Sequence, residues 1–344
     1  MDSVSPFNIF PGSFVIKLIM VTAFFLGLTF KMFSQDPQFS QFYTASMYLN
    51  PAFTGNTIQH RFTSIYRNQW PSVTKAYVSY SFAYDQNVTS INSGVGIMFT
   101  HDKAGTGGLR YTNIGGLYYY YFQINKKLMA RLGTKLSYTF RNYDQSKLRF
   151  NDQIITGSSS TIENLDQGIS YLDFSGGGLL YSEKFWAGFA MDHLNEPDQT
   201  LLNNNTPLPI KFSWHGGYKF VLDEGDARSE HGSSVTVATN YKAQEKWDQL
   251  DLGTYFDKDV FTLGFWYRGI PVFKKYKEGY SNNDAVIILL GVRSKRLKIG
   301  YSYDITISKL NNNKSGGAHE ISIVYEYDKK RKKRKKFFVP CAKF

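Results

Sequence analysis

Cysteine is almost absent from this chain, and Cys341, near the C-terminus, is the only one. A single cysteine forms no internal disulfide, so no disulfide framework holds the fold together. The six histidines never approach the spacing of metal ligands, such as a pair at i and i+4 beside an acid. After the N-terminal region, no run of residues is apolar enough to cross a membrane as a helix. We therefore expect no metal, no cofactor and no transmembrane helix beyond that region.

Aromatic residues, in contrast, are abundant. The 344 residues include 25 Tyr and 28 Phe, yet the mean hydropathy is only −0.34. Transmembrane β-barrels combine these two properties, because only alternate residues face lipid and aromatic rings gather at both membrane interfaces. The alternative is a large soluble β protein.

The clearest strand pattern lies at 128–141. Apolar residues such as Leu132 and Leu136 alternate with polar and charged residues such as Arg131 and Lys135. Side chains alternate across a strand with period two, whereas a helix would spread these charges around its apolar stripe. Because the strand is long, with an apolar face opposite a charged face, the pattern favours a membrane barrel.

Similar patterns recur in several later segments, although the segment 60–69 shows no clean alternation. Together they predict an all-β fold, a transmembrane antiparallel β-barrel of about 14 strands, with about 12 or 16 also allowed. Short and long connections mostly alternate, as periplasmic turns and extracellular loops do in outer-membrane barrels. The exceptions are the longer turn at 222–232 and the short outer loop at 243–246. This arrangement leaves both termini in the periplasm. The predicted strands are 60–69, 75–85, 91–101, 109–123, 127–141, 167–182, 184–193, 209–221, 233–242, 247–257, 259–268, 284–294, 296–306 and 317–327.

The chain divides into four predicted parts. Residues 1–34 contain a hydrophobic run and read as a cleaved signal peptide, with an uncleaved anchor helix as the alternative. Residues 35–59 contain two prolines, which disfavour a long strand and predict a short helix or coil at the periplasmic mouth or in the lumen. Residues 60–327 form the outer-membrane barrel, and 328–344 a basic periplasmic tail.

Three stretches together resemble the PorP/SprF family of outer-membrane proteins from the type IX secretion system of Bacteroidetes. The resemblance covers essentially the whole mature chain, and its first stretch is the most specific. The stretches are Gln35-Asp-Pro-Gln-Phe-Ser-Gln-Phe-Tyr43 with Leu49-Asn-Pro-Ala-Phe-Thr-Gly55, then Arg67-Asn-Gln-Trp70, then His193-Leu-Asn-Glu-Pro197.

The resemblance implies a non-enzymatic component of type IX protein secretion in the outer membrane of a Gram-negative bacterium. It is associated with gliding motility in some relatives. The expected partners are a secreted adhesin or its C-terminal targeting domain, type IX secretion components in the periplasm or outer membrane, and membrane lipids, but no nucleic acid. The alternative function is an outer-membrane channel or transporter for small solutes.

Two segments supply candidate partner-binding residues. The first, residues 193–197, follows a predicted strand and begins an outer loop, although its residue types also suit an ordinary turn. The second lies in the tail, where residues 329–336 are an unbroken basic run. This run either docks on an acidic periplasmic partner or on lipid headgroups, or it stays solvated and disordered. The candidates are His193, Asn195 and Pro197 in the loop, and Lys332, Arg334, Phe337 and Phe338 in the tail.

Catalytic residues are not expected. A Ser–His–Asp arrangement across the outer loops is conceivable, using His101-Asp102, Asp192-His193 and the serines at 158–160, because a triad is defined by geometry. Such residues are common in loops, however, and nothing local marks a nucleophile.

Inward charges of the predicted barrel have two interpretations. They line a water-filled pore that favours anions, or they pair with inward acids in a plugged lumen. We favour the plugged lumen. The inward bases are Arg131, Lys135, Arg141, Lys211 and Lys219, and the acids Asp173, Asp251, Asp304 and Glu320.

Overall fold

The computed structural model describes residues 36–57, 59–73, 77–105, 107–159, 161, 168–201, 206–223, 232–270, 275–277 and 280–327. The predicted signal peptide and the basic tail lie outside the described residues. Internal contacts divide the chain into two units, Met1–Gln38 and Phe39–Phe344. In the first unit the described residues, 36–38, form neither helix nor strand. Everything below concerns the second unit.

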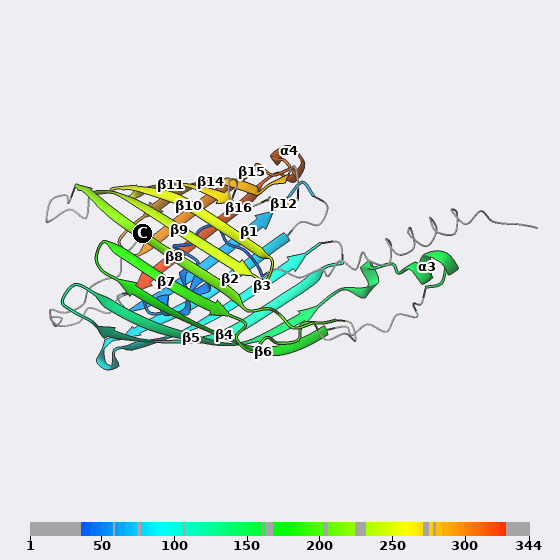
Figure 1. Ribbon diagram of the computed structural model, residues 1–344, viewed down its shortest axis with the longest axis horizontal. Coiled ribbons are helices and arrows are strands. Elements are labelled where there is room, and N and C mark those ends of the chain that lie inside the picture. The colour runs from blue at the N-terminus through cyan, green and yellow to red at the C-terminus, as the bar shows by residue number, and fades with distance from the viewer. Residues whose placement is uncertain are drawn as a thin grey trace, which may run out of the picture. The chain divides into compact units, whose positions relative to one another are not determined.

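Fourteen antiparallel strands form a closed barrel in which the first strand also pairs with the last (Figure 1). The predicted fold class is therefore confirmed, and each predicted strand overlaps one strand of the barrel. The barrel strands are β1 (His60–Gln69), β2 (Tyr77–Val88), β3 (Ser93–Ala104), β4 (Leu109–Gln123), β5 (Met129–Asn142), β6 (Gly168–Tyr181), β7 (Phe185–Asp192), β8 (Lys211–Asp223), β9 (Ser233–Gln244), β10 (Trp247–Lys258), β11 (Phe261–Gly269), β14 (Asn283–Arg293), β15 (Leu297–Thr306) and β16 (Ala318–Tyr327).

Short elements lie between the barrel strands and before them. A small hairpin, β12 (Lys275–Lys277) with β13 (Tyr280–Ser281), occupies a connection that the sequence patterns left as loop. None of the helices in the described ranges is long and apolar enough to cross a membrane. The helices are α2 (Ser46–Leu49), η1 (Pro51–Phe53), η2 (Thr89–Ile91), η3 (Gln145–Lys147), α3 (Asn151–Thr156) and α4 (Asn312–Ser315).

The connections distinguish the two ends of the barrel. At the end that we call the long-loop end lie the connections 143–167, 193–210, 270–282 and 307–317, with α3 and α4 (Figure 1). At the other, short-turn end lie tight connections such as 124–128, 182–184 and 294–296. Both ends of the barrel sheet, His60 and Tyr327, pair with one another at the short-turn end.

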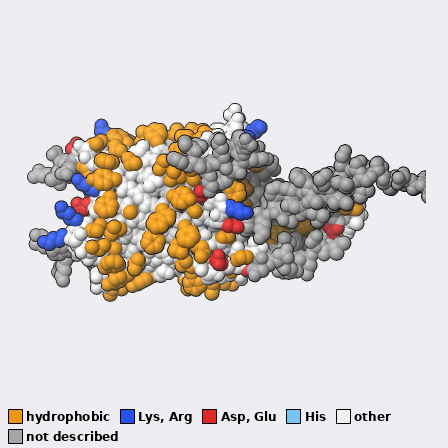
Figure 2. Space-filling view, viewed as in Figure 1, with side chains coloured by type: hydrophobic (Ala, Val, Ile, Leu, Met, Phe, Trp, Pro, Cys, Tyr) orange, Lys and Arg blue, Asp and Glu red, His pale blue; other side chains and the backbone are white. Residues whose placement is uncertain are grey.

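The outer wall of the barrel is apolar because the strands alternate as predicted. On β5, Leu132, Leu136 and Phe140 point outward and are exposed, whereas Arg131 and Lys135 point inward and are buried. Figure 2 shows clusters of hydrophobic side chains on the visible wall, with charged side chains towards its two ends. In lipid every backbone polar group must pair within the protein, and a closed sheet of this kind satisfies that requirement.

A charge placed on this wall tests the lipid-facing assignment. Leu136 lies midway along β5 and is 49% exposed. We expect Leu136→Arg to lower the free energy of unfolding in lipid vesicles by about 2–4 kcal/mol, the cost of Arg near the bilayer midplane. Ile155→Arg, in α3 beyond the wall, is the matched control and should unfold at the wild-type denaturant concentration. Equal stability of the two variants would contradict a lipid-facing wall.

Candidate functional site

Residues 39–57, which we call the luminal segment, lie inside the barrel (Figure 1). Most of their side chains are buried, and η1 contacts β4, β5 and β6. Two short helices, α2 and η1, lie within the segment. A barrel of about eight strands is filled by its own side chains, whereas one of about 16 leaves a channel. A 14-strand ring therefore has interior space that this segment occupies.

Ser40 anchors the luminal segment near the long-loop end. Its hydroxyl donates to Asp304 Oδ2 at 2.7 Å, and its backbone N–H donates to Glu320 Oε2 at 2.7 Å. The same hydroxyl accepts from Arg67 Nη1 at 2.9 Å and from Arg268 Nη2 at 3.0 Å. One serine thus joins strands β1, β11, β15 and β16, including the pair that closes the barrel.

The groups around Ser40 form a buried ionic cluster. Arg67 contacts Asp304 at 2.8 Å and Glu320 at 3.1 Å, and Arg268 contacts Asp251 at 2.8 Å and Asp304 at 3.3 Å. All five side chains are nearly inaccessible to solvent. Removing one partner of a buried ion pair costs about 3–5 kcal/mol, because the other charge stays buried without compensation. The cluster therefore ties the position of the segment to the closure of the barrel.

Asn50 fixes the middle of the segment. Its side-chain Nδ2 lies 2.9 Å from the Phe189 carbonyl oxygen and 3.0 Å from His215 Nε2, and its Oδ1 accepts from the backbone N–H of Ala52 at 2.8 Å. The wall has a glycine opposite this turn, which leaves room for the backbone of the segment. A Cβ on Gly133 would lie 2.3 Å from the Ala52 nitrogen, closer than any real contact.

A second buried ion pair holds the segment near the short-turn end. Arg61 binds Asp85 through Nε at 2.9 Å and Nη2 at 2.8 Å, the paired geometry that suits a guanidinium and a carboxylate. The Asp85 carboxylate also accepts from the backbone N–H of Gly55 at 2.7 Å. Gly55 has φ of 66° and lies against the Tyr119 ring, a backbone conformation and a close approach that favour glycine.

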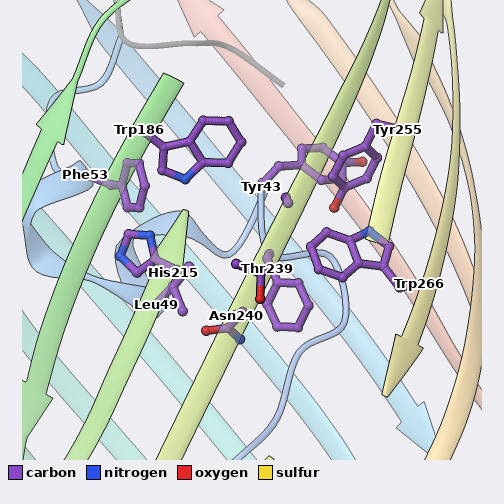
Figure 3. Close-up of a pocket in the computed structure, with 11 residues that line it drawn as sticks. Tyr43, Leu49, Phe53, Trp186, His215, Thr239, Asn240, Tyr255 and Trp266 are labelled. Carbon is purple, nitrogen blue, oxygen red and sulfur yellow. The ribbon is translucent and has the colours of Figure 1, made fainter. Parts of the chain in front are cut away.

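A cavity lies between the segment and the wall (Figure 3). Phe42 and Phe53 from the segment face Trp186 and Trp266 from the wall, with His215 beside Phe53. Its volume is about 30 Å³. A water needs about 10–15 Å³ by the same measure, so this space suits roughly two waters rather than an organic solute.

A family comparison identifies the chain. The model described as "Type IX secretion system membrane protein PorP/SprF" matches residues 31–325. The chain belongs to the PorP/SprF family. It is therefore an outer-membrane component of type IX secretion, and its family and fold are those of a secretion or transport membrane protein rather than an enzyme.

Solved structures similar to this PorP/SprF barrel include other outer-membrane proteins. The CymD monoaromatic hydrocarbon channel has a TM-score of 0.48 at 11% identity, covering 83% of this chain and 93% of that one. Omp33 of Acinetobacter baumannii has a TM-score of 0.42 at 6% identity, covering 80% and 100%. A Pseudomonas aeruginosa FadL homologue has a TM-score of 0.42 at 10% identity, covering 83% and 94%. No curated protein matches the sequence.

Other inward charges of the PorP/SprF barrel have partners that differ from those expected. Lys135 and Lys211 both contact Asp192, at 3.7 and 3.2 Å. The Arg131 guanidinium lies over the rings of Tyr119 and Tyr181, 4.7 and 5.0 Å from their centroids. Pairing within a filled lumen therefore accounts for these bases.

The candidate loop residues have structural contacts of their own. His193 is buried, with Nδ1 3.0 Å from Asp173 Oδ2, and Pro197 is also buried. Asn195 is exposed, and its side chain bonds the backbone of Leu172 and Phe174 on β6. Partner binding by these three residues stays a prediction. The four tail candidates, Lys332, Arg334, Phe337 and Phe338, lie outside the described residues.

Several of the residues considered for catalysis are described, and they have the following contacts. His101 Nδ1 lies 2.9 Å from the Thr112 hydroxyl, and Asp102 accepts from the Ser79 hydroxyl at 2.5 Å. His193 instead contacts Asp173 on the neighbouring wall. Within the described ranges, no group of three His, Cys, Asp or Glu is placed to hold a metal ion.

The sequence analysis missed an apolar pair in the loop 143–167. Ile154 and Ile155 of α3 are 66% and 84% exposed, and Figure 1 shows α3 well beyond the ends of β5 and β6. These side chains lie outside the lipid-facing wall and outside the lumen. The adjacency of two isoleucines in this loop was the available signal.

Polar contacts order the base of the same loop. The Lys147 and Ser146 side chains hydrogen-bond to the Asp144 carboxylate, and these bonds lower the pKa of Asp144 to about 2. The backbone N–H of Asp144 donates to the Gly107 carbonyl oxygen at 3.1 Å. The loop is thereby joined to the neighbouring connection at the long-loop end.

A substitution in the wall tests whether the luminal segment seals the barrel. Gly133→Val places a side chain where the Pro51 and Ala52 backbone lies, so we expect the segment to shift and ion conductance in planar bilayers to rise above that of the wild type. Gly116→Val on β4 is the matched control, since a Cβ there meets nothing within 4 Å. A folded Gly133→Val barrel that conducts no better than Gly116→Val would show that the segment is not the seal.

Proposed function

We propose that this PorP/SprF barrel binds or anchors a secreted cell-surface protein at its long-loop end. The observation that carries this proposal is the exposed pair Ile154 and Ile155 on α3. Large apolar side chains exposed away from lipid are typical of interaction sites. Loops on a rigid scaffold commonly carry binding residues, and this barrel supplies the scaffold.

The orientation of the barrel follows from its connections. Outer-membrane barrels have short periplasmic turns and longer extracellular loops. The long-loop end then faces outward and receives a secreted adhesin or its C-terminal targeting domain. The short-turn end faces the periplasm, together with both ends of the barrel sheet at His60 and Tyr327.

The basic tail then belongs to the periplasmic side, where it contacts secretion machinery. Residues 329–336 carry eight consecutive positive charges, followed by Phe337 and Phe338. Such a segment attracts an acidic protein surface or anionic headgroups over about 8–10 Å at physiological salt. Lys332 and Arg334 are the proposed charged contacts. A gliding role is compatible with an anchored adhesin at the opposite end.

The filled lumen favours a scaffold function over a function as a solute channel. The luminal segment is bound at both ends and in the middle, and the cavity beside it has about 30 Å³ of space. Passage of a solute would require displacement of this segment. Secreted-protein binding requires no such change.

Loss of the apolar pair tests the outward face. We expect the double variant Ile154→Asp and Ile155→Asp to capture at least about tenfold less of the secreted partner from detergent-solubilised outer membranes, since each truncated hot spot costs about 2 kcal/mol or more. Ile124→Asp is the matched control, because Ile124 is 53% exposed in a short turn at the opposite end. Equal capture by the double variant and the control would place the partner elsewhere.

A truncation tests the periplasmic face. A chain ending at Asp328 lacks the basic run, and we expect it to lose periplasmic type IX components in the same purification while it retains the secreted partner. Replacement of Lys332 and Arg334 by Glu in the full chain should weaken the same periplasmic capture, because it reverses two charges. Retention of all partners by the truncated chain would assign no docking role to the tail.

A further inference from the structure

Two basic side chains face one another on the outer wall of the barrel. Lys103 on β3 and Arg110 on β4 are direct cross-strand partners close to the long-loop end, and both are exposed. Because side chains alternate along each strand, they share the outward face with Ile97 and Ile114, which are also exposed. Like charges directly opposite one another on one face of a sheet destabilise it. An anion bound between them would relieve this repulsion.

The neighbours of this pair on the outward face carry no charge. Val78 on β2 is the other cross-strand partner of Lys103, and Asn142 on β5 is the other partner of Arg110. With the rest of the described residues, neither base forms an ion pair or a side-chain hydrogen bond. The exposed amide of Asn142 adds a neutral hydrogen-bond donor to the row.

Two carboxylates near the pair are bound elsewhere. Asp102 accepts from the Ser79 hydroxyl at 2.5 Å, on the inward side of the wall. Asp144, at the base of the loop 143–167, accepts from the Ser146 hydroxyl at 2.6 Å and from the Lys147 ammonium group. Within the part of the chain that the structure describes, both carboxylates are thus already used, which points to an anion from the surroundings.

The surroundings of the pair are the lipid headgroups. Phe99 on β3 and Ile114 on β4 are the last apolar side chains of their outward rows before the long-loop end. Lys103 and Arg110 each lie four residues beyond them, about 13 Å along the strand, or about 10 Å along the membrane normal for a tilt of about 35–45°. The polar layer of a bilayer is about 5–8 Å deep on each side. Both charges therefore reach beyond the hydrocarbon into that layer.

We propose that Lys103 and Arg110, with the amide of Asn142 beside them, bind the phosphate headgroup of a membrane lipid. The guanidinium group of Arg110 offers two parallel N–H donors to phosphate oxygens, and the ammonium group of Lys103 supplies a compact second charge. This lipid site is separate from the proposed partner-binding role, and neither depends on the other.

The position of the pair favours a lipid over a soluble anion. Exposed ion pairs are weak in water, so two surface bases alone hold a free phosphate poorly. A lipid also brings acyl chains, which lie against Ile97, Phe99 and Ile114 on the same face of the wall. The wall and the pair therefore bind the two parts of one molecule.

Native mass spectrometry of the detergent-solubilised full chain tests the proposal. The probes are lipid A, a phosphorylated and acylated glycolipid, and its dephosphorylated form. The double variant Lys103→Gln and Arg110→Gln removes both charges. Lys126→Gln with Lys127→Gln is the matched control, because it removes two exposed charges from the short turn 124–128. Heat-modifiable electrophoretic mobility verifies that each barrel is folded.

We expect the wild type and the control to retain lipid A equally, and the double variant to need at least about tenfold more of it, since each lost charge-assisted contact lowers affinity by about tenfold. Dephosphorylated lipid A should bind the wild type as weakly as lipid A binds the double variant. Equal retention of lipid A by the double variant and the wild type would overturn the proposal.

Two further results would also overturn it. Equal losses in the double variant and the control would show that net charge attracts the lipid, with no site on the wall. Displacement of lipid A from the wild type by inorganic phosphate at the same concentration would show that the pair binds a soluble anion and that the acyl chains contribute nothing.

Discussion

Pairing of β1 with β16 is the constraint on which the rest of the structure depends. A sheet edge left open in lipid would expose unpaired backbone groups, each costing several kcal/mol, so the sheet must close. Closure with fourteen strands makes a ring wider than its own inward side chains can fill. The chain fills that space with residues 39–57, and the bonds from Ser40 to Arg67 and Glu320 place this filling directly against the closing strands.

The buried charges inside the barrel fix the position of the luminal segment more than they stabilise the fold. Buried ion pairs gain little over apolar packing of the same shape, but they are costly to break. Arg67 between Asp304 and Glu320, and Arg61 against Asp85, therefore act as fixed points for a segment that has little regular structure of its own. With Asn50 held in the middle, sliding of the segment by one residue would break all three attachments at once. The lumen therefore holds residues 39–57 in one register.

The wall and the loops of the barrel face different surroundings. Alternation along each strand assigns one face to lipid and the other to the interior, which leaves the strands little freedom to carry a partner-specific surface. Side chains that face neither lipid nor lumen lie in the connections, where α3 carries two exposed isoleucines.

The sequence by itself determined the barrel, because a two-residue period is a local property that needs no knowledge of neighbours. The alternation at 128–141 and the alternation of short and long connections predicted observed strands. The strand at 60–69 was also predicted, without a clean alternation to support it. The family motifs predicted the secretion role. Only the tertiary structure decided that Gly133 receives the Ala52 backbone, that His193 is buried against Asp173, and that Ser40 lies near the long-loop end. These contacts join residues that are far apart in the chain, across a curved sheet. No local sequence pattern encodes which side chains meet there.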